Sequence, residues 1–165
     1  MWATDAVSGW VRSAGGTAPG VWLIKNVVSP MQRSIYRRTR GRVSLTGRLP
    51  VLLLTTTGHR SGKPRTVPVF YLRSGDSFVI CNVRPPGERA NPWVGNVRAE
   101  PWVRLEISGL LLRGRVRPAT EAEIARIWPQ LVAIWPAFQT FFSAGGERSV
   151  FVVEPVPQEP RDFTP

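Results

Sequence analysis

Residues 50–72 read PVLLLTTTGHRSGKPRTVPVFYL. The first run, residues 50–54, is apolar, and the last run, residues 66–72, is rich in the Val, Thr, Phe and Tyr residues that favour β-strands. A polar, cationic stretch punctuated by two glycines separates the two runs. The pattern predicts two strands joined by a loop that is held in place at both ends.

The composition of this loop predicts an anion-binding site. Gly58 and Gly62 permit positive φ angles and a close approach of the backbone to a ligand, and Ser61 adds a hydroxyl group. The other donors, most of them permanently charged, are His59, Arg60, Lys63 and Arg65. A phosphate or a carboxylate is the natural ligand of such a loop, although a solvated basic turn has the same composition.

The charge of the chain favours the anion-binding interpretation. Between Asp5 and Asp76 there is no acidic residue, whereas the same interval contains twelve Lys or Arg residues. The whole chain has a formal net charge of +11 and a pI near 11.5. We therefore expect a polyanionic partner, which is a nucleic acid, an anionic membrane surface or a multiply charged small molecule.

Length and composition limit the class of protein. A chain of 165 residues fits one domain with a sizeable core. No apolar run approaches the roughly 20 residues that cross a bilayer, and the N-terminus lacks the pattern of a secretory signal. One cysteine and one histidine exclude an internal disulfide, a Cys-rich zinc site and a His-dependent triad outside the loop. We expect a cytoplasmic protein, soluble or peripheral, without a metal site.

Three segments are expected along the chain. They are a flexible N-terminus (residues 1–20), a folded domain (residues 21–155) and a proline-rich tail (residues 156–165). Within the folded domain, residues 21–39 interleave apolar residues with Lys and Arg. They predict a short helix, a break at Ser29 and Pro30, and a second, basic amphipathic helix that runs into Arg40 and Arg42. This helix either packs on the sheet with its arginines solvated or lies on an anionic membrane surface at the inner face of the cell membrane.

The remainder of the chain predicts further strands linked by tight turns, at residues 77–82, 103–107, 111–117 and 149–154. The Asn-Pro pair at residues 91–92 suits the cap and first turn of a short helix that continues to residue 98. Thr120 and Glu123 form the capping box of a longer helix. We expect this helix to be interrupted at Pro129 and Pro136.

About six strands joined mainly by hairpins imply an antiparallel sheet, which avoids exposed edges by closing into a barrel. The expected fold class is mainly β (α+β): a small antiparallel β-barrel with flanking helices. Arg113, Arg115 and Arg117 share one face of their strand. They are expected to form a solvated edge that discourages pairing between sheets, with nucleic-acid binding as the alternative.

The chain resembles the deazaflavin-dependent nitroreductase family, whose members are split β-barrels of the flavin-reductase type that use coenzyme F420. The resemblance covers about residues 22–156 and is most specific over residues 52–65, LLLTTTGHRSGKPR. Weaker matches follow in the expected order: PVFYL at 68–72, NPW at 91–93, NVRA at 96–99 with Pro101, Trp-Pro at 128–129 and 135–136, and the closing strand at 150–155. The resemblance implies a split β-barrel that binds F420.

This resemblance fits the loop chemistry, because F420 carries a deazaflavin ring on a ribityl chain that ends in a phosphate and an oligoglutamate tail. It implies that the loop holds the phosphate through Arg60, Ser61, Lys63 and Arg65, together with nearby backbone amides. His59, Gly62 and Pro68 complete the expected cofactor-binding residues of this region; His59 either contacts the phosphate or is a solvated turn histidine. Arginine suits this role because its planar fork can bind two oxygens at once.

The resemblance also implies contacts beyond the phosphate. The backbone around Cys81 and Asn82, and the segment containing Asn91 and Trp93, would contact the ring. Arg84 or the nearby Arg89 would meet the carboxylate tail.

A hydride transfer from a reduced deazaflavin needs positioning and exclusion of water more than covalent help from the protein. The sequence agrees, since it offers no obvious nucleophile or acid–base pair. Where nitroreducing relatives place tyrosines, this chain has Trp135, Phe138 and Phe141. We therefore expect a flat, hydrophobic, quinone-like acceptor with weak nitroaromatic reduction, unless these aromatic residues are simply core.

Several alternatives stay open at this point. FMN would place its phosphate in the same loop. A non-catalytic carrier of the deazaflavin or of a lipid would keep the loop without turnover. A nucleic-acid-binding barrel would use the same charge and aromatic residues, but the positive charge is concentrated in one loop and one helix, so no nucleic acid is expected. A homodimer is a further expectation.

Overall fold

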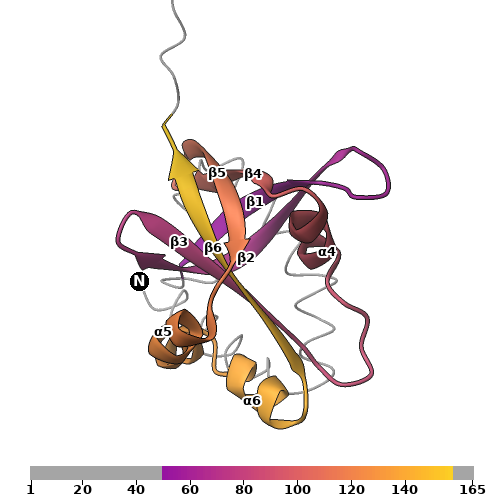
Figure 1. Cartoon of the computed structure of the whole chain (residues 1–165), viewed down its shortest axis with the longest axis vertical. Helices are drawn as coiled ribbons and strands as arrows, with labels where there is room; N and C mark the ends of the chain where they lie inside the picture. The colour runs from indigo at the N-terminus through magenta and orange to yellow at the C-terminus, as the bar shows by residue number, and fades with distance from the viewer. Residues whose placement is uncertain (1–49, 158–165) are drawn as a thin grey trace, which may run out of the picture.

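The computed structural model describes residues 50–157, which form a closed barrel of six antiparallel strands flanked by three helices (Figure 1). The strands are β1 (Val51–Thr57), β2 (Pro64–Ser74), β3 (Ser77–Arg84), β4 (Trp102–Ile107), β5 (Leu110–Pro118) and β6 (Glu147–Val156). The helices are α4 (Pro92–Ala99), α5 (Glu121–Ile134) and α6 (Ala137–Ser143).

The predicted fold class is confirmed by this barrel. The expectations for a flexible N-terminus and for the helices of residues 21–39 lie outside the described residues, as does most of the expected tail (residues 156–165). Val156, which was assigned to that tail, is instead the last residue of β6. Within residues 50–157, no helix is long and apolar enough to cross a bilayer.

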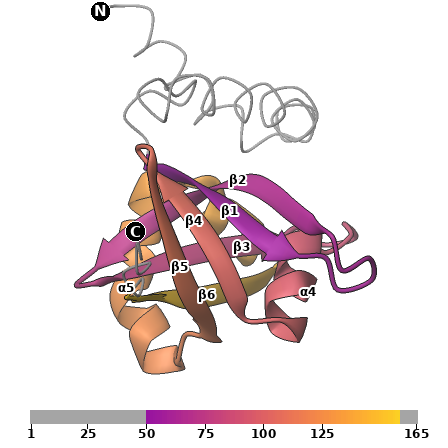
Figure 2. The same ribbon diagram turned by 90° about the horizontal axis from the view of Figure 1, so that it is seen from above.

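The strand order around the barrel is β1-β2-β3-β6-β5-β4, with β4 returning to β1. Strands β1, β2 and β3 are joined by hairpin turns, and β4 and β5 form another hairpin. The barrel closes because β4 pairs with β1, for example through Leu105 and Leu54. Two longer connections interrupt the hairpins. One carries α4 between β3 and β4, and the other carries α5 and α6 between β5 and β6 (Figure 2).

The inside of the barrel is filled by residues that alternate along each strand, as the period of two in a strand requires. In β1, for example, Leu52 and Leu54 are fully buried in the interior. Helix α4 contributes Trp93, Val94 and Val97 to the same core. It therefore plugs one end of the barrel, beside the β1–β2 loop (Figures 1 and 2).

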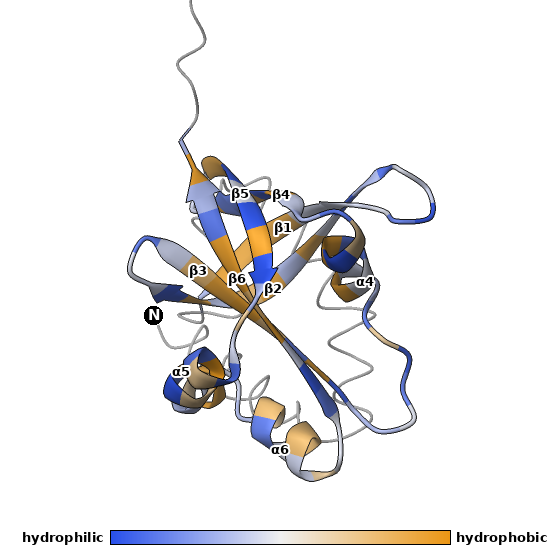
Figure 3. Cartoon of the chain, in the orientation of Figure 1, coloured by the Kyte–Doolittle hydropathy of each residue, from blue (hydrophilic) through white to orange (hydrophobic). Residues whose placement is uncertain are grey.

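A second apolar layer lies outside the barrel, between the sheet and the helices α5 and α6. Val79, Cys81 and Val83 point outward from β3 into this layer. The helices cover them with Ile127, Leu131 and other side chains that include Trp135 and Phe138. The hydropathy colouring of Figure 3 shows apolar residues along the strands and hydrophilic residues in the β1–β2 loop.

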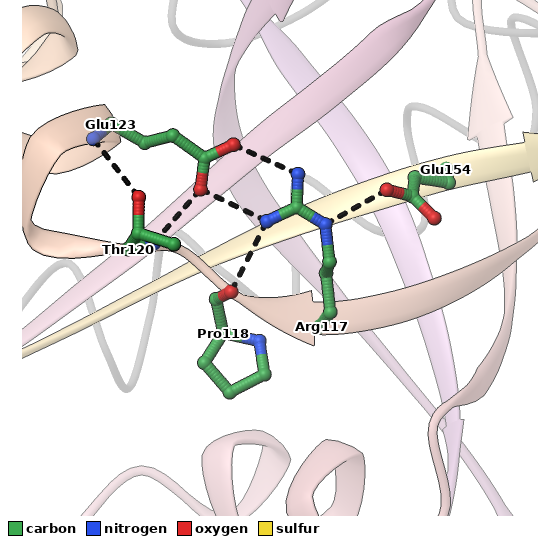
Figure 4. Close-up of polar contacts among 5 residues, drawn as sticks. All are labelled: Arg117, Pro118, Thr120, Glu123 and Glu154. Carbon is green, nitrogen blue, oxygen red and sulfur yellow. Dashed lines mark hydrogen bonds and ion pairs between the residues drawn. The ribbon is translucent and has the colours of Figure 1, made fainter.

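The corner between β5, α5 and β6 is held by one arginine (Figure 4). Arg117 donates two hydrogen bonds to the carboxylate of Glu123, at 2.8 and 2.9 Å, and one to Glu154 at 2.8 Å. The predicted capping box is confirmed, because Thr120 accepts from the amide of Glu123 while the Glu123 carboxylate accepts from the amide of Thr120. These bonds lower the pKa of Glu123 from 4.5 to about 2, mainly through Arg117.

The prediction of a solvated sheet edge at Arg113, Arg115 and Arg117 is wrong. Strand β5 pairs with β4 on one side and with β6 on the other, so closure of the barrel leaves it no free edge. Arg117 is moreover occupied by its two carboxylate partners.

Three local predictions also need correction. Residues 55–57 continue β1, because Thr55 pairs with Thr66 and the ladder extends to the pair of Thr57 and Pro64. Helix α5 runs through Pro129 without interruption. The carbonyl of Ala125, which loses its intrahelical donor there, belongs to an exposed residue and can bind water instead. Asn91 precedes α4 as predicted but makes no side-chain cap hydrogen bond.

Candidate functional site

The cationic loop is a short, closed turn between β1 and β2, over residues 58–63. The carbonyl of Gly58 accepts hydrogen bonds from the amides of Ser61 (3.1 Å) and Gly62 (2.7 Å), and the amide of Gly58 donates to the carbonyl of Lys63 (2.9 Å). Gly62 has φ +65°, which favours glycine. A Cβ on Gly58 would lie 2.7 Å from the Ser61 hydroxyl. Both glycines predicted to shape the loop thus have a structural reason to be there.

The cations of this loop face solvent without a counter-ion. His59, Arg60, Ser61, Lys63 and Arg65 are all exposed. Within residues 50–157, no carboxylate lies at ion-pair distance from the loop's arginine or lysine side chains, since the described ion pairs belong to other arginines. The turn therefore presents concentrated positive charge, as an anion site requires. Pro68, predicted at the same site, is half-buried farther along β2.

Most backbone amides of the loop are already used inside the protein. Gly58, Ser61 and Gly62 donate within the turn, and the amide of His59 donates to the side chain of Asn96. Side chains must therefore supply most of the donors to a bound anion. This revises the expectation that nearby amides share that task.

An anchor that sequence reasoning did not identify holds the loop against α4. The Oδ1 atom of Asn96 lies 3.0 Å from the amide nitrogen of His59 and 2.8 Å from its Nδ1. The Nδ2 atom of Asn96 donates to the hydroxyl of Thr56 at 2.9 Å. Asn96 is 4% exposed and Thr56 is 2% exposed. A polar residue on the buried side of a short helix was the signal that could have identified Asn96.

Two of the predicted ring-contact residues have buried side chains, and two are half-buried. The side chain of Cys81 is buried in the outer apolar layer, where desolvation raises the pKa of its thiol from 9.0 to about 12. Trp93 is 3% exposed and packs edge-on against Phe151 inside the barrel. Neither side chain is available to a ligand, so any contact there must use the backbone. Asn82 and Asn91 are half-buried.

Helix α4 connects this region with the loop. Asn96 contacts the loop, and two residues later the guanidinium of Arg98 donates to the hydroxyl of Ser149 at 3.1 Å. Ser149 pairs with Asn82 across the β3–β6 ladder. Hydrogen bonds and strand pairing thus connect the loop, through α4 and β6, to the end of β3.

The two arginines predicted for the carboxylate tail differ in availability. Arg84 forms an ion pair with Glu147, which lowers the pKa of that carboxyl, and also donates to the carbonyl of Glu88. Arg89 is exposed and has no ion-pair partner within residues 50–157. Arg89 is therefore the better placed of the two to meet a free anion.

The three aromatic residues predicted to line a substrate pocket belong to the layer under α5 and α6. Trp135 stacks on Phe70 with ring centroids 4.9 Å apart and is 7% exposed. Phe138 is equally buried, whereas Phe141 is half-buried. The structure thus places Trp135 and Phe138 in the core and leaves Phe141 partly accessible.

The comparison with protein families decides the identity of the barrel. The sequence pattern of the family described as F420H(2)-dependent quinone reductase matches residues 29–155. The chain belongs to the F420H(2)-dependent quinone reductase family.

Individual relatives agree with this assignment. The F420H(2)-dependent quinone reductase Rv1261c of Mycobacterium tuberculosis (strain H37Rv) is 32% identical over 114 residues, which are 65% of this chain and 76% of the relative. A solved structure described as an F420-H2 dependent reductase (FDR-A) is 26% identical and aligns with a TM-score of 0.57 over 64% of this chain and 94% of its own. A structure described as a domain-swapped dimer is 24% identical, with a TM-score of 0.60 over 83% of this chain and 100% of its own, and shows the same fold.

Membership in the F420H(2)-dependent quinone reductase family confirms three predictions. The barrel is that of the F420 reductases, the protein is an oxidoreductase, and its cofactor is coenzyme F420. A quinone-like acceptor fits the family as well. The residues that bind the cofactor and the acceptor stay predictions.

Proposed function

We propose that this quinone reductase holds the phosphate of F420 in the loop of residues 58–63 and reduces a flat, hydrophobic, quinone-like acceptor. The observation that carries the proposal is the uncompensated charge of the loop, in which Arg60, Lys63 and the adjacent Arg65 are exposed beside a closed, glycine-shaped turn. A phosphate needs this combination of charge and donors.

Different side chains of the protein are suited to the phosphate and to the carboxylate tail of F420. Arg60 and Arg65 can each offer a planar fork to two phosphate oxygens, while Lys63 supplies a compact charge. Ser61 adds a neutral donor. Each charge-assisted hydrogen bond contributes about 1.5–3 kcal/mol, less where water screens it. Arg89 is the group we assign to the carboxylate tail.

When bound, reduced F420 supplies a hydride. The protein's contribution is to orient the ring and to exclude water. We assign the ring to the backbone of residues 81–82 and to the segment of residues 91–93, at the start of α4. On the acceptor side, the accessible Phe141 would contact the quinone, with Trp135 and Phe138 packed behind it.

The test of the phosphate site is a fluorescence titration of the protein with F420, with FMN as competitor. The double variant Arg60→Ala/Lys63→Ala should bind F420 about tenfold to a hundredfold more weakly, because two charge-assisted bonds, partly screened by water, are lost. The matched control Arg104→Ala/Arg113→Ala removes the same charge from the outer face of β4 and β5. Equal losses in both double variants would show a general charge effect and would contradict the site. Turnover of a soluble quinone by the wild type then separates an enzyme from a carrier.

Contact with an anionic membrane surface is a further part of the proposal. Within the described residues it is supported by the outer face of the β4–β5 hairpin, where Arg104 lies directly opposite Arg113. Arg113 also lies 6.0 Å from the ring centre of Trp102, which is 45% exposed. Leu110 and Leu111, at the tip, are each 61% exposed. Like charges opposite one another are destabilising without an anion, and arginine beside exposed aromatic and aliphatic groups suits lipid headgroups.

Sedimentation with vesicles of anionic or neutral lipid tests this contact. Leu110→Ser/Leu111→Ser should reduce the fraction that sediments with anionic vesicles, as should deletion of residues 1–29. Unchanged sedimentation in both variants would exclude these surfaces.

A cytoplasmic location and a homodimer complete the proposal. Sedimentation equilibrium of the purified protein tests the dimer directly.

A further inference from the structure

We infer that Asn96 is the positioning residue that fixes the ring of His59, so that its Nε2 atom is left open for the phosphate that the loop is proposed to hold. The inference rests on the proposed function of the loop. It starts from the two hydrogen bonds that the Oδ1 atom of Asn96 makes to His59, at 3.0 Å to the amide nitrogen and at 2.8 Å to Nδ1.

The orientation of the Asn96 amide follows from its partners. The backbone amide of His59 can only donate, so the Asn96 atom beside it must be the carbonyl oxygen. The other Asn96 atom, Nδ2, then donates to the hydroxyl of Thr56 at 2.9 Å. That hydroxyl lies 3.4 Å from the carbonyl of Arg65, to which it can donate in turn. In this series of hydrogen bonds, each donor thus faces an acceptor.

The position of the hydrogen on the His59 ring follows from the same hydrogen bonds. Because Oδ1 of Asn96 is an acceptor, the Nδ1 atom of His59 must carry a hydrogen. The second ring nitrogen, Nε2, has no hydrogen-bond partner within residues 50–157, and His59 is exposed. The ring also lies against α4, since a Cβ on Gly95 would be 3.5 Å from its Cε1. The ring is thus held on one edge and open at Nε2.

The open nitrogen belongs to the same loop as the uncompensated cations. Its neighbours along the loop are Arg60 and Lys63, with Ser61 between them. In the imidazolium form both ring nitrogens carry a hydrogen, so Nε2 adds a donor to that set, and a phosphate oxygen can accept it. Asn96 acts through His59 and also links the two strands beside the loop, because Thr56 is the second-last residue of β1 and Arg65 is the second residue of β2.

The tautomer can be measured without the cofactor. The chain has a single histidine, so a long-range ¹H–¹⁵N correlation spectrum of the full, tag-free chain contains one set of imidazole signals. We expect the neutral ring to carry its hydrogen on Nδ1, the reverse of the usual preference of a free imidazole. In Asn96→Leu the usual Nε2–H form should return. A wild-type ring protonated on Nε2 would overturn the inference.

The phosphate contact is tested with two matched variants and two ligands. His59→Asn keeps an amide nitrogen near the position of Nδ1 and deletes the group at Nε2, whereas His59→Gln keeps a donor near Nε2. The ligands are F420 and the same deazaflavin without its phosphate and tail. We expect His59→Asn to bind F420 about tenfold or more weakly and the phosphate-free ligand unchanged, while His59→Gln retains most of the F420 affinity.

The outcomes separate the two proposals. If wild-type protein does not bind F420, the proposed function fails and the phosphate role of His59 fails with it. If the wild type binds F420 and His59→Asn binds it equally well, this inference alone is wrong. An equal loss for both ligands would assign His59 and Asn96 to general folding of the loop, which also contradicts a phosphate contact.

Discussion

Replacing Gly62 by alanine should weaken F420 binding, whereas the same replacement at Gly75 should not. Both glycines have positive φ angles, +65° and +59°, and a Cβ at either position would meet nothing within 4 Å. The two substitutions therefore impose the same backbone cost without a steric clash. Gly62 lies in the cationic loop, and Gly75 lies in the β2–β3 turn.

The size of the effect follows from this geometry. A residue with a Cβ destabilises the fold by roughly 1–2 kcal/mol when its backbone lies in the left-handed region. This corresponds to a loss of about 3–8 °C in the melting temperature of a domain of this size. The loop in Gly62→Ala can escape that cost by leaving the closed turn, in which the Gly62 amide donates to Gly58. Its binding-competent population would then fall about five- to thirtyfold, and the F420 affinity would fall with it.

Calorimetry or thermal unfolding gives the stability of each variant, and the fluorescence titration with F420 gives its affinity. We expect a loss of stability in both variants, no larger in Gly62→Ala than in Gly75→Ala, and a loss of affinity in Gly62→Ala alone. If both variants lose stability but bind F420 like the wild type, the closed shape of the loop does not matter for binding and the reasoning is refuted.

Three further predictions concern the scaffold. Because the hydrogen bonds from Arg117 lower the pKa of Glu123 from 4.5 to about 2 in the folded state, the stabilisation from this carboxylate is present above pH 4.5 and is lost as the pH falls towards 2. The melting temperatures of wild type and Glu123→Gln should therefore differ at pH 7 and converge at low pH, and a constant difference would be inconsistent with this assignment. Burial raises the pKa of the Cys81 thiol to about 12, so a disulfide reagent at pH 8 should label Cys81 in urea but not in the folded protein, and rapid labelling of the folded protein would show that the thiol is accessible. Trp135→Ala should cost about 3–5 kcal/mol of unfolding free energy in urea titrations, since the ring is buried against Phe70, and a loss below about 1 kcal/mol would show that the ring is not part of the core.

The fold was predictable because its signals are local. Alternation of apolar residues identified the strands, and glycine-containing turns such as Ser74 to Ser77 joined them into hairpins. The capping box of Thr120 and Glu123 fixed the start of α5. Closure of the barrel followed from the need to protect sheet edges.

What the sequence did not show depends on contacts between distant residues. The anchor between Asn96 and the loop joins positions 37 residues apart, and its evidence is the burial of a polar side chain. Trp93 was predicted to contact the deazaflavin ring, yet the helix that carries it plugs the barrel and buries the indole side chain. Propensity alone would break α5 at Pro129, but packing of the helix on the sheet overrides it.

The central claim is that the loop of residues 58–63 holds the phosphate of F420, and a crystal structure of the full chain with F420 tests it most directly. The account predicts the phosphate within hydrogen-bonding distance of the side chains of Arg60, Ser61 and Lys63, with Nε2 of His59 facing a phosphate oxygen. A phosphate bound instead on the outer face of β4 and β5, near Arg104 and Arg113, would contradict it.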